Sequence, residues 1–184
     1  GNSVKASVHA VYGCTAGDSE IDVAFSASIS GFSAMFVEVA NLAASAALDI
    51  AIGGNPTLSG SGQNIQSGSM TTGTAGDIVF QFIGCSDFGA GGSGGAGNQN
   101  KCTSFAKQSG YTNLFTDPQS QAHACQYQIQ GSAGATNPAY VPTQTTYPSS
   151  WVSITAAFKA GSSGSVPAST KQRVFGIAHF KVDG

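Results

Sequence analysis

Three histidines are the residues of this chain best suited to metal binding or proton transfer, because an imidazole titrates near neutral pH. His9, His123 and His179 fall on three different expected strands, and "HAC" places His123 two positions before Cys125. A zinc site would require them to converge with a thiolate or a carboxylate. The alternation of its strand points His9 outward. We therefore expect exposed strand histidines, no metal site and no cofactor.

Three carboxylates are spaced to share one face of a strand. Asp18, Glu20 and Asp22 stand at i, i+2 and i+4, so their oxygens would form one stripe that could bind Ca²⁺. Calcium sites are more often built from loops, and no basic residue next to them in sequence is spaced to pair with them. We interpret the stripe as a solvated face that favours solubility.

Motifs for a nucleophile or for phosphate binding do not occur in the sequence. There is no G-x-S-x-G elbow, and the glycine-rich run at residues 88–100, "FGAGGSGGAGNQN", is not followed by a GK[ST] triplet. With nine Asp and Glu in total, few residues are available for the carboxylate pair of a glycoside hydrolase. We therefore expect that the protein is not an enzyme.

Four aromatic residues could stack against sugar rings. They are Trp151, Tyr111, Tyr140 and Tyr147. Packing in the core or at an interface is the more frequent role of a single tryptophan, so both readings stay open. Runs such as "TTGT", "TQTT" and "SSGS" could carry O-linked sugar.

The composition points to an extracellular protein with a neutral surface. Only 9% of the residues are charged and the net charge is −2, which leaves no basic patch for nucleic acid. No run of 18 apolar residues could span a membrane. The first ten residues, "GNSVKASVHA", lack the features of a signal peptide. We expect localisation outside the cell or at its surface.

Four cysteines without C-x-x-C spacing favour two disulfides and an oxidising compartment. Three connectivities are possible. We favour Cys85–Cys102, which would close the glycine-rich loop, and Cys14–Cys125. Buried free thiols are the alternative.

Strand patterns dominate the chain. "SVKASVHAVYG", "SEIDVAFS" and "FSAMFVEVA" alternate apolar and polar residues, whereas "DIVFQFIGC" is apolar almost throughout, as in a strand covered on both faces. Short strands between Gly, Ser, Thr and Pro turns predict an all-β fold, a two-layer antiparallel β-sandwich of Ig-like or jelly-roll-like type.

The two halves of the chain also align with each other, which predicts an internal two-fold repeat. Val8 matches Cys125 and Met35 matches Ile154. The other pairs are Ala10–Tyr127, Tyr12–Ile129, Phe32–Trp151, Val37–Ala156 and Val39–Phe158. The second half begins with "GDIVFQFIGC", but no such strand precedes the first half. Only "QRVFGIAHF", near the end of the chain, has the right character.

This arrangement predicts a sandwich over residues 1–160, a flexible linker over 161–170 and a detached C-terminal strand over 171–184. The strand would either close its own sheet or complete that of a neighbouring molecule. Its side chains at the intersubunit contact would be Arg173, Val174, Phe175, Ile177 and Phe180. Exchange with a neighbour is heterologous and open-ended, so it would produce a filament.

Several motifs together resemble an uncharacterised domain found repeatedly in predicted secreted proteins of soil bacteria such as acidobacteria. These are "DIVFQF", "SGYT" at 109–112, "YQIQGSAG" at 127–134 and the tryptophan strand ending in "AAFK" at 151–159. The resemblance covers most of residues 8–160 and implies a secreted β-sandwich without an established activity. In that family a strand like "QRVFGIAHF" precedes the domain, whereas here it follows.

The first functional hypothesis is therefore a structural subunit of an extracellular, pilus-like fibre that polymerises with itself by donating its C-terminal strand. The alternative is a carbohydrate-binding or adhesin module of a larger surface protein, in which glycans would be the partner.

Overall fold

The computed structural model describes residues 3–14, 24, 31–43, 46–85, 102–117, 123–144, 149–161 and 171–181. Every regular element in these ranges is a β-strand, and all pairings are antiparallel, which confirms the all-β antiparallel prediction. In chain order the strands are β1 (Ser3–Cys14), β2 (Gly31–Ala40), β3 (Leu48–Gly54), β4 (Thr57–Leu58), β5 (Ile65–Gln66), β6 (Met70–Thr72), β7 (Ile78–Cys85), β8 (Cys102–Lys107), β9 (Thr112–Asp117), β10 (His123–Ile129), β11 (Gly134–Thr136), β12 (Ala139–Gln144), β13 (Ser149–Phe158) and β14 (Lys171–Lys181).

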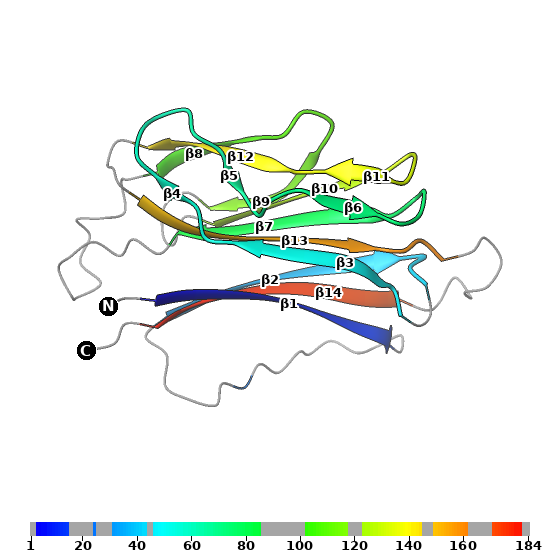
Figure 1. Cartoon of the computed structure of the whole chain (residues 1–184). Coiled ribbons are helices and arrows are strands. Elements are labelled where there is room, and N and C mark those ends of the chain that lie inside the picture. The colour runs from blue at the N-terminus through cyan, green and yellow to red at the C-terminus, as the bar shows by residue number, and fades with distance from the viewer. Residues whose placement is uncertain are drawn as a thin grey trace.

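The strands form a sandwich with a central sheet covered on both faces (Figure 1). The central sheet has the order β3-β13-β7-β10-β9, with β4 paired to the start of β13. On one face lies a three-stranded sheet, β1-β14-β2, which we call the slot sheet. On the other face lie β5-β12-β8 and the pair β11-β6. The sandwich prediction holds, and the short strands add a layer to the two that were expected.

Strands β7 and β13 lie at the centre of the sheet and are buried on both faces. Phe80 and Phe82 of β7 point toward the slot sheet, where they join Met35 and Val39 of β2 in one core cluster. Ile83 points to the opposite face and packs in a second cluster, with Trp151 and other buried residues. Both faces of β7 therefore lose water contact, as its nearly continuous apolar sequence predicts.

The core below the central sheet is built around Phe80. Its ring lies 6.0 Å from Phe82, 6.1 Å from Tyr127 and 6.1 Å from Phe158, measured between centroids. The contact with Phe158 is edge-on, at 68° between ring planes, a geometry that aromatic rings favour. These side chains come from β7, β10 and β13, so the cluster holds the three inner strands of the central sheet together.

The alternating sequence of strand β2 places one set of side chains toward the core and the other set on the outer face. Met35 and Val39 are buried and Val37 is half-buried, as the pattern predicts, whereas Phe36 is 51% exposed on the outer face. The register of β2 is therefore fixed by its inward face, because a slip of one residue would exchange the two faces.

A chain of buried polar side chains crosses the other face of the central sheet. Gln81 of β7 and Gln126 of β10 are fully buried cross-strand partners. The amide nitrogen of Gln126 donates to Gln81 Oε1 at 2.6 Å and to the carbonyl of Ala139 at 3.0 Å. Gln81 Nε2 donates to Ile65 O and to Ser153 Oγ, both at 3.0 Å. These bonds connect the central sheet to β5 and β12.

Candidate functional site

The predicted C-terminal strand lies inside a sheet of its own chain. Strand β14 runs between β1 and β2 and pairs with ten residues of each. The backbone partners of the five predicted contact residues are Val11 and Glu38 for Arg173, Ala10 and Val37 for Val174, His9 and Phe36 for Phe175, Ser7 and Ala34 for Ile177, and Val4 and Gly31 for Phe180. The side chains of β14 lie outside the described residues. We call the space that β14 fills between β1 and β2 the slot.

The structure does not confirm that the C-terminal strand is detached. In the described chain β14 is the middle strand of its sheet and forms one ladder with β1 and another with β2. Without β14, each of these two strands would have an unpaired edge facing the other. The reason is physical: the facing backbone groups of β1 and β2 need partners, and β14 supplies both sets.

Strand β14 holds in the slot sheet the place that β7 holds in the central sheet. Val8, Gly176 and Met35 form one row across β1, β14 and β2. Cys125, Phe82 and Ile154 form the row across β10, β7 and β13. In these two rows Val8 takes the position of Cys125, and Met35 takes that of Ile154, which are the pairs matched in the alignment of the two halves. The structure does not establish the predicted repeat itself, but it gives the two three-strand ladders the same register.

The mouth of the slot lies beside the end of β13. Gly161 donates its backbone N–H to Asn41 O at 2.6 Å, and the preceding Ala160 forms a bridge with Leu42. The neighbouring Ala40 is the register partner of Lys171. The chain thus leaves the central sheet and enters the slot at the same end of the sandwich, which we call the mouth end. A Cβ on Gly161 would lie 2.9 Å from Leu42 O, so the close approach requires glycine.

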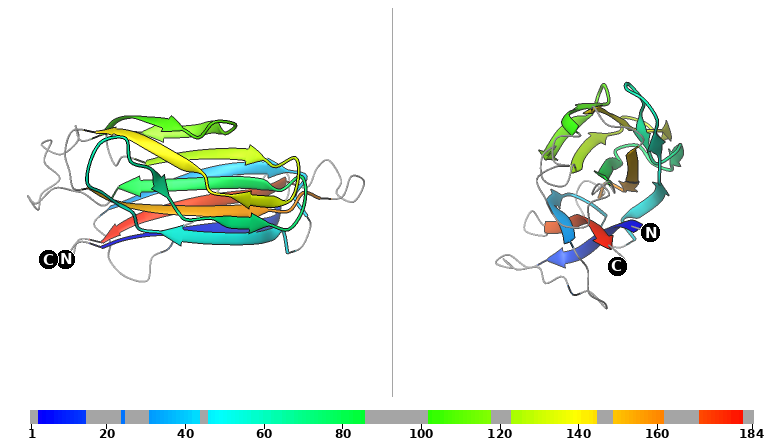
Figure 2. Two further views of the ribbon diagram at one scale, coloured as in Figure 1. Left: turned by 45° about the horizontal axis from the view of Figure 1, so that its top comes forward. Right: turned by 90° about the vertical axis from the view of Figure 1, so that its left-hand side faces the viewer.

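The opposite end of the slot brings the first and last described strands together. Ser3 pairs with Lys181, so the start of β1 and the end of β14 lie side by side there (Figure 2). We call this the far end. The turn between β4 and β5 also lies at the far end, since β4 pairs with the first residues of β13.

The predicted sugar platform is not exposed. Trp151, Tyr111 and Tyr140 are 1%, 5% and 0% exposed. Tyr140 donates to Asn113 Oδ1 at 2.9 Å, and the Tyr111 hydroxyl lies 2.9 Å from Thr136 Oγ1. These three residues are part of the core, so the interpretation as a sugar-stacking surface is wrong for them. Tyr147 lies outside the described residues.

The histidines do not converge among the described side chains. His9 is exposed as expected, with Nε2 3.0 Å from Ser7 Oγ. His123 is buried, contrary to the expectation, and stacks on Phe115 at 5.0 Å. Residue 179 is paired with β1 and β2 through its backbone. No group of three or more His, Cys, Asp or Glu that could hold a metal occurs in the described part. Asp18, Glu20 and Asp22 fall outside it.

The predicted Cys14–Cys125 disulfide is wrong. Cys125 is a free, fully buried thiol, because its side chain points into the core cluster beside Met35 and Phe82. Burial raises the pKa of this thiol well above its usual range, which keeps it in the unreactive protonated form. The side chains of the predicted Cys85–Cys102 pair lie outside the described residues.

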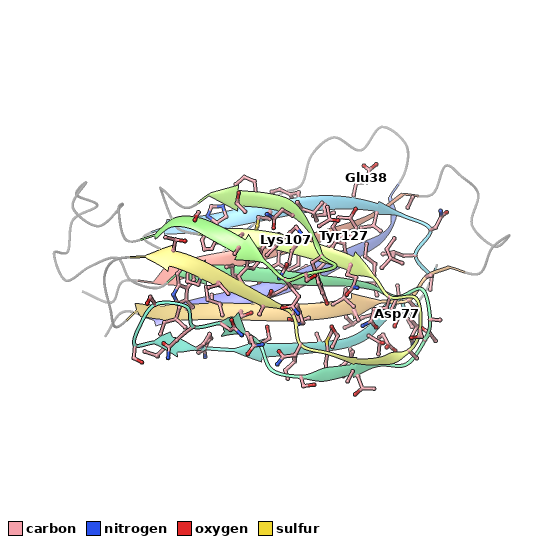
Figure 3. The ribbon with its side chains drawn as sticks, turned by 90° about the horizontal axis from the view of Figure 1, so that it is seen from above. Glu38, Asp77, Lys107 and Tyr127 are labelled. Atoms are coloured by element: carbon pink, nitrogen blue, oxygen red, sulfur yellow. The ribbon has the colours of Figure 1, made fainter. Side chains whose placement is uncertain are left out.

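A buried carboxyl lies at the mouth end. Asp77, labelled in Figure 3 where β7 begins, has no exposed surface. Burial is the largest cause that raises its pKa; the Thr74 hydroxyl opposes it by donating a hydrogen bond, and the carboxylate of Asp49 raises the pKa further. Asp49 also accepts from Gly73 N at 2.6 Å and lies 3.7 Å from Lys159 Nζ. These contacts join the β6–β7 turn to β3 and to Lys159, the residue that follows β13.

In the part of the chain that is described, no helix is long and apolar enough to cross a membrane. Comparisons with family models, with curated proteins and with solved structures find no match to this chain. The resemblance to a secreted bacterial domain therefore stays a prediction.

Proposed function

We propose that the protein is a structural subunit of an extracellular fibre whose copies are linked by exchange of β14. The observation that carries this proposal is the position of β14: a strand at the end of the described chain is the middle strand of its sheet. When β14 is withdrawn, β1 and β2 present two unpaired edges that face each other. A strand of the same sequence from another copy fits that space.

The alternative partners of an open slot are less complementary. Twenty residue pairs fix the register of β14, ten on each side, and any other strand would have to reproduce the row that places Gly176 between Val8 and Met35. Main-chain hydrogen bonds supply affinity in strand addition, and pockets for alternate side chains supply specificity. A second copy of this chain satisfies both. The weakly charged composition suits dense packing of identical copies.

The covalent connection decides when exchange occurs. Closed and exchanged forms contain the same ladders, so the balance depends on the effective concentration that the connecting segment gives β14 at its own slot. For a short connection this is in the millimolar range. We therefore expect closed monomers in dilute solution and exchange when chains fold at high local concentration.

A disulfide placed across the slot tests the proposal. Ala34 and Ile177 are register partners, and opposed residues in antiparallel strands are close enough for a disulfide. The double variant Ala34→Cys/Ile177→Cys is refolded at concentrations from micromolar to millimolar, oxidised and examined by non-reducing electrophoresis. The single variants are the controls for the native cysteines.

Exchange predicts covalent multimers that grow with the refolding concentration and contain the engineered disulfide between two chains. If only monomers with an internal disulfide form at every concentration, β14 closes its own sheet and the proposal fails. Electron microscopy of the multimeric fractions then shows whether they are fibres.

A further inference from the structure

We infer that each strand-exchange link joins like ends of two copies, so that the subunits lie side by side in the fibre and their strands run across its axis. This inference rests on the proposed exchange of β14. The positions where the chain leaves one sandwich and enters the next decide which surfaces of two copies meet.

The exit and the entrance lie at the same end. Gly161, the last described residue before β14, is bonded to Asn41. Lys171, the first residue of β14, is paired with Ala40. Because β14 is antiparallel to both β1 and β2, a donated strand in this register also enters its acceptor at the mouth end and finishes at the far end.

The connecting segment is too short for an end-to-end arrangement. Ten Cα-to-Cα steps separate Gly161 from Lys171, which reach at most about 36 Å when fully extended and about 18 Å as a flexible coil. The slot holds a strand of 11 residues, a length of about 36 Å. If the mouth end of the donor touched the far end of the acceptor, the segment would have to cover the whole slot length and the gap between subunits as well.

A side-by-side arrangement fits the available reach. The central sheet follows five strands from β3 to β9, a width of about 24 Å at the usual strand spacing, and three layers about 10 Å apart give a similar thickness. Neighbouring mouth ends are then separated by about 24–30 Å or less. The same constraint is met by two copies that exchange strands reciprocally.

Cross-linking of assembled full-length chains tests which ends meet. Ala160 is exposed at the mouth end and Ser61 is exposed in the β4–β5 turn at the far end. Ala160→Cys chains are assembled alone, and also mixed with Ser61→Cys chains, and treated with a flexible bismaleimide; wild-type chains give the background from native cysteines. The rise per subunit is measured on images of the fibres.

Cross-links between two Ala160→Cys chains well above the wild-type background, with a rise of about 30 Å or less, are the expected result. Cross-links only between Ala160→Cys and Ser61→Cys chains, with a rise of about 36 Å or more, would overturn the inference while leaving strand exchange intact. Reciprocal dimers cross-linked through Ala160→Cys would support like ends but refute the fibre. Absence of any interchain disulfide in the Ala34→Cys/Ile177→Cys variant refutes the proposed function itself.

Discussion

Replacing Gln126 by leucine should destabilise the protein although the two side chains are similar in size, because buried hydrogen bonds are lost. The substitution Gln126→Leu removes the donor to Gln81 Oε1 and to Ala139 O, both in a buried region. It also removes the acceptor of Gln108 N, but Gln108 is exposed and its N–H can bond water. Two buried acceptors lose a partner, at about 1–3 kcal/mol each, so we expect a loss of about 3 kcal/mol.

The double variant Gln81→Leu/Gln126→Leu separates lost hydrogen bonds from lost packing. Gln81→Leu alone leaves Ile65 O and one proton of Gln126 without their partner. In the double variant the Gln126 amide donor and its acceptor, Gln81 Oε1, are removed together, so neither is left buried without the other. The combined loss should therefore be smaller than the sum of the two single losses by about 1 kcal/mol or more.

Urea unfolding of the four chains, analysed by linear extrapolation, gives the required free energies. Gln128→Leu is the matched control, since Gln128 lies on the same strand and face but is only half-buried; it should change stability by less than about 0.5 kcal/mol. Additive losses, or a Gln126→Leu variant as stable as the wild type, would show that the polar chain does not hold the layers together.

Three further outcomes are expected. Cys125 should resist thiol reagents in the folded protein and react after unfolding, because its thiol is buried and its pKa is raised; rapid labelling of this residue in native protein would contradict the burial. Asp77 has a raised pKa in the folded state, so its stabilising effect is complete below the unfolded pKa near 4 and is lost as the pH rises through the folded value. Asp77→Asn should therefore flatten the decline of the melting temperature from pH 4 to pH 7, and an unchanged profile would assign the decline to other groups. Gly161→Ala should cost about 1 kcal/mol by displacing the chain from Asn41, whereas Gly131→Ala, which meets open space, should not lower the unfolding free energy measured in urea.

The periodicity of apolar residues predicted the architecture, because the face of a strand that packs on the core must be apolar. The alternation around Met35 and the nearly continuous apolar run of β7 correctly indicated a half-covered and a fully covered strand. The same reasoning did not determine the partner of β14. The sequence pattern of a strand shows that its edges must be paired. It does not show whether the partner strand belongs to the same chain or to a second copy, because both have the same sequence.

Side chains at central positions were harder to interpret. Trp151 and Tyr140 were candidates for a sugar surface and are core residues, because the additional layer of short strands covers that face of the central sheet. Strands of two or three residues, such as β5 and β6, carry too little pattern to be detected. The glutamines in "FQF" and "CQYQ" were the available signal for the polar chain: each interrupts an apolar strand, and a polar group there must find a partner.

The row that joins Ser3 to Lys181 has a consequence for biosynthesis. During synthesis β1 waits for β14, and contacts so distant in the chain form slowly. Until then, the nascent molecule carries two open sheet edges, which are aggregation hazards. Proteolytic removal of β14 would recreate that hazard in a finished molecule, so it should harm solubility far more than an equal loss from a surface turn.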